Sequence, residues 1–158
     1  MYEGGTREPL IFRWPGVVEP GSTCDVPVTS PDFYPTLLEI AGIPLKPEQH
    51  VDGVSLLPLL KGAQSLEREA IFWHYPHYGN QGGTPGSSIR VGDNKLIHFF
   101  EGDRFELYNL REDISEDHNL AIKKPYLVER LKIQLANWRE KIEAKIPQPN
   151  LDYGENYD

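Results

Sequence analysis

The chain has 158 residues, of which 39% are hydrophobic and 25% charged, and its formal net charge is −8. This acidic balance argues against non-specific binding to nucleic acid or to an anionic membrane. No apolar run reaches the roughly 18 residues that a membrane-spanning helix needs. Cys24 is the single cysteine, which excludes a disulfide framework and a zinc site built from cysteines. The length fits one ordinary domain or two small ones.

The chain opens with a polar turn at 3–7 that contains two glycines, and an apolar stretch at 9–14 follows directly. Paired glycines permit positive φ. Pro9 fixes φ at the entrance of what we expect to be a buried strand, where its missing N–H is tolerated. Such a strand has no preceding partner, so the pattern indicates that the chain begins in the middle of a larger domain.

Two helical segments are expected in the first half. Residues 30–32, Ser-Pro-Asp, are typical of a helix start, because serine caps, proline suits the first position and an acidic side chain complements the helix dipole. Apolar residues three or four apart continue this helix to Gly42. A leucine-rich turn at 55–60 is expected to pack on the same core and to end near Gly62.

The second half is rich in β-branched and aromatic runs, which predict a four-stranded antiparallel sheet. The expected strands are 70–75, 88–91, 95–100 and 105–110. Glycine-aspartate turns separate the later runs and favour hairpins. A helix of some twenty residues, from Pro125 to about Lys145, has an apolar stripe that would cover one face of the sheet.

These elements predict a fold in two parts. Residues 1–67 form an α/β fragment, and residues 68–146 form an α+β subdomain in which four antiparallel strands pack on one long C-terminal helix. An acidic tail follows at 147–158.

Two histidines are the first candidates for a functional site. His74 and His77 lie where the strand at 70–75 gives way to a glycine-rich loop, a frequent position for site residues. Residues i and i+3 of a strand point to opposite faces, so the pair is unconvincing as a metal site. The imidazoles could hydrogen-bond an anion or a sugar hydroxyl; the alternative is that both are structural and hold the loop.

Two arginines are the other candidates. Arg7 follows the opening glycines and Arg90 follows the glycine-rich loop. A guanidinium group can form a fork to an oxyanion such as sulfate or phosphate. Either arginine could equally pair with a structural carboxylate, and Glu3 and Glu8 lie close to Arg7 in the sequence. The residues alone form no complete catalytic constellation and no set of metal ligands.

Three motifs occur in order along the chain. They are Tyr2-Glu3-Gly4-Gly5-Thr6-Arg7-Glu8-Pro9, then Pro31-Asp32-Phe33-Tyr34-Pro35-Thr36-Leu37-Leu38, then Asp52-Gly53-Val54-Ser55-Leu56-Leu57. With His74-Tyr75-Pro76-His77-Tyr78, Ile89-Arg90, Lys95-Leu96-Ile97 and Phe105-Glu106-Leu107-Tyr108-Asn109-Leu110, they resemble the type I sulfatases of the alkaline phosphatase superfamily. The resemblance extends to about residue 145.

The resemblance implies that 1–67 hold the last strand and helices of the catalytic α/β domain and that 68–146 are the C-terminal sulfatase subdomain. Family members hydrolyse sulfate esters with a formylglycine, made from Cys or Ser in a C/S-x-P-x-R motif, beside a calcium ion. Neither that motif nor the family's calcium-binding residues occur in this sequence, and Cys24 has its proline one place too late. We therefore expect a fragment without catalytic residues, metal ligands or cofactor of its own, inactive alone.

The resemblance also implies a substrate class and partners. Sulfated polysaccharides or glycosaminoglycan-derived sugars are the expected substrates of the intact enzyme, with aryl sulfates as an alternative. The N-terminal part of the catalytic domain is the expected partner, and the family is periplasmic, secreted or lysosomal. In relatives with a similar segment the subdomain shapes the substrate pocket, which favours His74 and His77 as substrate-binding residues. A related phosphoesterase or phosphonate hydrolase and a non-catalytic sugar-binding β module remain alternatives.

Overall fold

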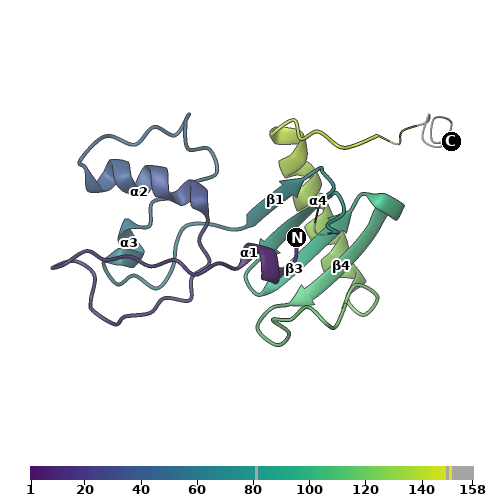
Figure 1. Cartoon of the computed structure of the whole chain (residues 1–158), viewed down its shortest axis with the longest axis horizontal. Helices are drawn as coiled ribbons and strands as arrows, with labels where there is room; N and C mark the ends of the chain where they lie inside the picture. Colours follow the sequence, from purple (N-terminus) through teal and green to yellow (C-terminus); the bar gives the residue numbers. More distant parts are fainter. Residues whose placement is uncertain (81, 149, 151–158) are drawn as a thin grey trace. The chain divides into compact units, whose positions relative to one another are not determined.

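The computed structural model describes residues 1–80, 82–148 and 150, and the chain divides into two compact units (Figure 1). One unit combines Met1–Glu8 with the residues from Ala70 onward, and the other is Pro9–Glu69. The first eight residues thus lie with the sheet, although the sequence placed them with 9–67. The acidic tail expected at 147–158 falls largely outside the described residues. No helix in the described part of the chain is both long and apolar enough to cross a membrane.

The larger unit contains the antiparallel sheet that the sequence predicts. Its four strands follow the order β1-β2-β3-β4 and are Ile71–Tyr75, Gly86–Val91, Asn94–Phe99 and Arg104–Asn109. Tight turns join the last three strands, and Gly92 and Gly102 adopt positive φ there, a conformation that glycine reaches without steric cost. The prediction of a four-stranded antiparallel sheet is confirmed.

One face of the sheet packs on α4, Pro125–Lys141 (Figure 1). The core between them consists of Ile89, Leu96, Leu107, Val128, Leu131 and Leu135. The rings of Phe72 and Trp138 stack at 4.7 Å between centroids. The helix ends a few residues before the predicted 145, and Glu143 soon after its end has a left-handed φ of 52°, which no helix can continue through.

The chain's first residues cover the opposite face. Residues of α1, Glu3–Thr6, lie over it, and Met1 packs on a second buried cluster made of Ile97, Phe99, Tyr108 and Leu110. The ring of Tyr2 lies 5.9 Å from Phe99 and 6.3 Å from Tyr108, centroid to centroid. The turn predicted at 3–7 is therefore a helical turn, and neither of its glycines adopts positive φ.

The smaller unit is built around a buried carboxylate. It contains a 3₁₀ turn at Ser30–Asp32, α2 at Phe33–Ile40 and α3 at Leu57–Leu60, which confirms the two predicted helical segments. Asp32 is fully buried and accepts hydrogen bonds from the backbone N–H of Thr29 at 2.7 Å and of Val54 at 3.0 Å, and it pairs with Arg68. This residue therefore ties together three segments, a larger role than favouring the helix dipole.

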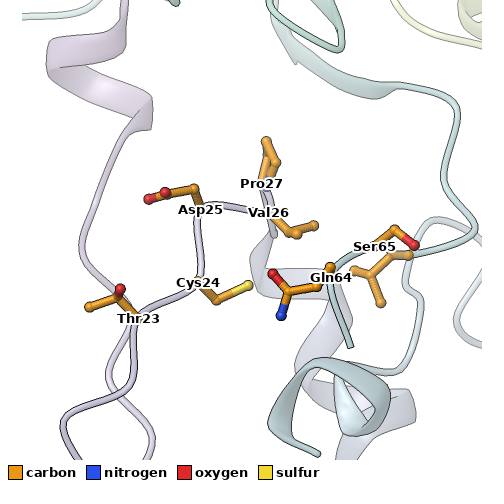
Figure 2. A pocket seen from close by; sticks show the side chains of 8 residues that line it. Thr23, Cys24, Asp25, Val26, Pro27, Gln64 and Ser65 are labelled. Carbon is orange, nitrogen blue, oxygen red and sulfur yellow. The ribbon is translucent and has the colours of Figure 1, made fainter. Parts of the chain in front are cut away.

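A shallow hollow on the same unit is lined by residues 23–27 and 64–66 (Figure 2). The exposed Cys24 contributes its thiol, and Figure 2 shows the sulfur turned toward the Gln64 side chain. Among the described residues that line this hollow there is no ion pair and no buried polar side chain that would bind a ligand.

Residues 9–14 form no strand in the described structure, contrary to the prediction. A strand exists through ladder hydrogen bonds with a neighbour, and the four strands of the sheet pair only with one another. Ile11 is 88% exposed and Leu10 is 40% exposed, so the apolar character that suggested a buried strand is not buried within this chain.

A close approach of two backbones makes Gly86 a sensitive position. A Cβ atom there would lie 2.7 Å from the carbonyl oxygen of His98 on β3. We expect Gly86→Ala to lower the free energy of unfolding by roughly 1–3 kcal/mol through overpacking, measured by urea denaturation. Gly5→Ala is the matched control, because nothing lies within 4 Å of its added Cβ. Equal effects of the two substitutions would show that the β2–β3 spacing is not the cause.

Candidate functional site

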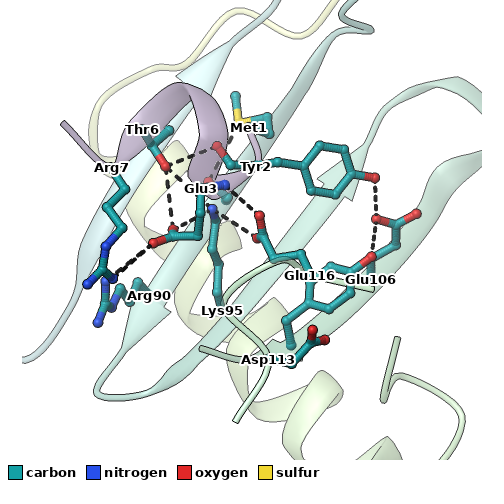
Figure 3. Close-up of polar contacts among 12 residues, drawn as sticks. Met1, Tyr2, Glu3, Thr6, Arg7, Arg90, Lys95, Glu106, Asp113 and Glu116 are labelled. Carbon is teal, nitrogen blue, oxygen red and sulfur yellow. Dashed lines mark hydrogen bonds and ion pairs between the residues drawn. The ribbon is translucent and has the colours of Figure 1, made fainter. Parts of the chain in front are cut away.

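A buried ion cluster lies on the sheet face that α1 covers (Figure 3). Lys95 on β3 has no exposed surface, and its Nζ lies 2.8 Å from Glu3 Oε1 and 3.1 Å from Glu116 Oε1. Glu116 Oε2 also accepts a 2.5 Å hydrogen bond from the backbone N–H of Glu3. A buried ammonium is costly unless it is paired, and here two carboxylates surround it.

Both arginine candidates meet the other oxygen of Glu3. Arg7 Nη1 lies 3.6 Å and Arg90 Nη1 lies 3.8 Å from Glu3 Oε2. The Arg7 side chain is 57% exposed and that of Arg90 is 16% exposed, so the pair lies where the cluster reaches solvent. Figure 3 shows the two guanidinium groups beside each other.

The histidine candidates do not join this cluster. His74 on β1 pairs in register with Ser87, which places it on the face that packs on α4, whereas Arg90 and Lys95 lie on the opposite face. His74 Nδ1 lies 2.8 Å from Ser87 Oγ, and its Nε2 lies 2.9 Å from the carbonyl oxygen of Lys145. His77 is exposed and packs edge-on against the Tyr75 ring at 5.4 Å. The four candidates therefore divide between two regions of the unit.

A second carboxylate on the α1 face binds two phenols. Tyr2 and Tyr108 donate hydrogen bonds of 2.6 and 2.8 Å to Glu106 Oε2, and the other oxygen, Oε1, pairs with Arg104. Burial, with a smaller contribution from Tyr2, raises the pKa of Tyr108 to about 12. Tyr108 therefore stays a hydrogen-bond donor at any physiological pH, which suits an anchoring role.

His98 links a hairpin to the long helix on the α4 face. Its Nε2 donates to Asp103 at 2.7 Å, and its Nδ1 accepts from Arg139 at 2.9 Å. The ring stacks on Phe105 with centroids 4.1 Å apart. Burial lowers the pKa of His98, and the positive charges of Arg139 and Lys132 act in the same direction against the opposing pull of Asp103.

The pKa of His98 gives a stability prediction with a definite sign. Because the folded-state pKa lies below the ordinary 6.5, the unfolded chain binds a proton first as the pH falls. The contribution of neutral His98 is complete above about pH 6.5 and is lost as the pH drops toward the folded-state pKa. We expect the free energy of unfolding, measured in urea, to fall less between pH 7.5 and pH 5.5 in His98→Gln than in the unsubstituted chain. His118→Gln, at an exposed position, is the control, and an unchanged slope in His98→Gln would contradict the assignment.

The chemistry that the resemblance implies does not fit the residues present. In the part of the chain that the structure describes, no three His, Cys, Asp or Glu side chains converge to hold a metal ion. Cys24 is exposed in a loop, and the sequence after it, Asp25-Val26-Pro27, departs from the C/S-x-P-x-R motif. No reaction step can be assigned to these side chains.

A family model supplies the identification. The model for the C-terminal region of N-sulphoglucosamine sulphohydrolase matches residues 1–141. The chain belongs to this family. It corresponds to the C-terminal portion of a sulfatase in the alkaline phosphatase superfamily, as the sequence motifs predict.

Individual sulfatases agree with this assignment. A sulfatase of Formosa agariphila is 36% identical over 99% of this chain and 33% of its own length. An N-acetylglucosamine-6-O-sulfatase of Bacteroides thetaiotaomicron is 34% identical over 80% of this chain and 23% of its own length. Human arylsulfatase A is 32% identical over 92% of this chain and 32% of its own length. The chain thus spans about a third or less of the curated sulfatases it matches.

Solved structures share the fold. A protein solved in complex with its substrate D-glucosamine-2-N,6-O-disulfate superposes with a TM-score of 0.72 at 27% identity, over 85% of this chain and 28% of that one. A 2-O glycosaminoglycan sulfatase gives a TM-score of 0.61 at 27% identity, over 80% and 26%. The four-stranded sheet with its C-terminal helix is therefore a sulfatase C-terminal subdomain.

Sequence reasoning missed the residues at the centre of the cluster. Lys95 stands in a motif without a local chemical signature, Glu116 lies outside the motifs, and 92 residues separate Lys95 from Glu3. The sequence did not mark Lys95 as buried, because this residue begins the predicted strand 95–100 directly after the polar turn residues Asp93 and Asn94.

Proposed function

We propose that the chain is the C-terminal part of a sulfatase that hydrolyses sulfate esters of carbohydrates, and that it has no hydrolytic activity alone. The observation that carries the proposal is the family match over residues 1–141. Relatives whose names specify glucosamine and hexuronate sulfates, and a similar structure with a disulfated glucosamine as its substrate, support the carbohydrate class.

The division of labour follows from the motifs. Residues 9–67 would belong to the catalytic α/β domain, where 9–14 would pair with strands from the rest of the enzyme. Residues 68–146 would form the C-terminal subdomain, with the first eight residues covering its sheet. The formylglycine nucleophile and the calcium ion would come from the rest of the enzyme, since this sequence has no C/S-x-P-x-R motif. We assign no catalytic residue and no metal ligand to the chain.

We propose that Arg7, Arg90, His74 and His77 contact the sulfated substrate in the intact enzyme. The arginines are supported by their partly exposed guanidinium groups beside Glu3. His77 is supported by its exposure. His74 has the weakest support, because both of its ring nitrogens already have partners in the chain.

The proposal is tested on the purified 158-residue chain. Incubation with p-nitrophenyl sulfate and with D-glucosamine-2-N,6-O-disulfate should release no sulfate above the buffer blank in ion chromatography. Calorimetry should show saturable binding of the disulfated sugar and no binding of unsulfated glucosamine. Sulfate release would contradict the inactivity, and equal binding of the two sugars would contradict recognition of the sulfate groups.

A phosphonate monoester hydrolase is the second candidate. The enzyme from Silicibacter pomeroyi superposes with a TM-score of 0.59 at 25% identity, over 82% of this chain and 28% of that one. Under this alternative, an aryl phosphonate monoester should compete with the disulfated sugar in the calorimetric experiment. If the phosphonate monoester does not compete, the result favours the sulfatase over the phosphonate hydrolase.

A further inference from the structure

We propose that Lys95 is a positioning residue of an anion site. Its buried ammonium fixes Glu3, and Glu3 brings Arg7 and Arg90 together where their remaining N–H groups bind a sulfate group. The anion site is the pair Arg7 and Arg90. The choice of a sulfate ester as ligand rests on the proposed function, whereas the geometry of the site does not.

The two oxygens of Glu3 face different partners. Oε1 is held by the Lys95 ammonium at 2.8 Å, and Thr6 Oγ1 lies 3.5 Å from the same ammonium. Oε2 is left for the two arginines, at 3.6 and 3.8 Å. Because the buried Lys95 ammonium holds Oε1, the orientation of the Glu3 carboxylate is fixed. Its other oxygen, Oε2, therefore faces both guanidinium groups on the solvent side.

Glu116 completes the support of Glu3. It binds both the Lys95 ammonium and the backbone N–H of Glu3, so side chain and backbone of Glu3 are fixed by the same pair. Glu116 itself adopts a left-handed φ of 58°, which is uncommon for a residue with a long side chain. Such strain persists only where the surrounding contacts impose it, and it is concentrated at functional positions.

The arginines keep donors for a ligand. Distances of 3.6–3.8 Å to Glu3 are ion pairs rather than hydrogen bonds. Arg90 donates one hydrogen bond, from Nε to the carbonyl oxygen of Gly92 at 3.0 Å, and Arg7 donates none within the described residues. A guanidinium group has five N–H donors, so most of them remain available to an oxyanion.

The charge of the cluster favours an anion. Three cationic side chains, Arg7, Arg90 and Lys95, face two carboxylates, Glu3 and Glu116, which leaves one uncompensated positive charge. The chain as a whole carries −8, so this excess is a local exception. A tetrahedral oxyanion between two guanidinium groups would balance it through charge-assisted hydrogen bonds.

The test follows the arginine side-chain Nε–Hε signals of the full chain by NMR at constant ionic strength. Sodium sulfate and D-glucosamine-2-N,6-O-disulfate are titrated separately. We expect saturable shifts of the Arg7 and Arg90 signals, and about a tenfold loss of affinity in Arg7→Gln and in Arg90→Gln. Arg111→Gln is the matched control, because that arginine pairs with Asp93 at an exposed position.

The positioning role is tested by Lys95→Met, with Glu116→Gln as the variant that keeps the cluster closest to its native shape. In either folded variant we expect the Arg7 and Arg90 signals to move before any ligand is added, and the affinity for sulfate to fall as in the arginine variants. Unchanged signals and affinity in a folded variant would overturn the positioning role.

The outcomes separate this inference from the proposed function. Sulfate binding at the two arginines without tighter binding of the sugar would support the anion site and contradict the proposal of a carbohydrate substrate. An unchanged affinity for the sugar in both arginine variants would be compatible with the proposed function and would overturn the anion site.

Discussion

Replacing Leu131 with alanine should lower the free energy of unfolding of the sheet unit by about 2–5 kcal/mol. Leu131 lies in the middle of α4 with no exposed surface, packed against the sheet residues Ile89, Leu96 and Leu107. Truncation removes buried methyl groups and leaves a cavity that a helix fixed along its length cannot close. Urea denaturation followed by tryptophan fluorescence measures the effect.

The choice of probe and control makes the result specific. Trp138 stacks on Phe72 between α4 and the sheet, so its fluorescence reports on this contact. Trp14 lies in the other unit and is replaced by phenylalanine in all variants, and the remaining Trp73 lies on β1, so both tryptophans that are left report on the sheet unit. Ile133→Ala is the matched control, because Ile133 lies on the same helix with 60% of its surface exposed and should change stability little. A similar loss in both variants would mean that α4 does not hold the sheet through this face.

Replacing Lys95 with methionine should lower the free energy of unfolding by about 3–5 kcal/mol. Methionine fills much of the same volume, but the substitution leaves the buried carboxylate of Glu116 without its counter-charge and leaves Glu3 with only the more distant Arg7 and Arg90. Urea denaturation in the same background measures the loss. It should depend weakly on salt, because mobile ions screen buried charges poorly.

Two further variants identify the cause of that loss. Lys123→Met at an exposed position should have little effect. Adding Glu3→Gln and Glu116→Gln to Lys95→Met removes the uncompensated charges and should restore part of the stability. If the triple variant were less stable than Lys95→Met alone, packing rather than charge would be responsible.

Local patterns in the sequence were sufficient for most of the secondary structure. The aromatic and β-branched runs around Phe72 and Ile97 predicted the strands, because each strand packs on at least one apolar surface. Gly92 and Gly102 marked turns that need positive φ. The helix ending at Ile40 was predictable from its start signal and its apolar spacing.

What the sequence did not reveal depends on distant partners. The apolar stretch at 9–14 predicted a strand, but strand formation also requires pairing with a neighbour, and the four described strands pair only with one another. The pairing of Glu3 with Lys95 joins segments that share no local pattern. The candidates Arg7 and Arg90 were identified by residue type alone, whereas their convergence on one carboxylate required the register of β2 and β3.

The cover that the first eight residues give to the sheet has a consequence for folding. These residues precede their partners on β3 and in the segment after β4 by 92 and 113 residues. Closing so long a loop slows folding, since its entropy cost precedes the gain from the contacts. Residues 9–69 can fold during that delay as an insertion within the sequence of the sheet unit. Residues 1–8 are therefore expected to be the last part of the sheet unit to pack, although they precede the rest of it in the sequence.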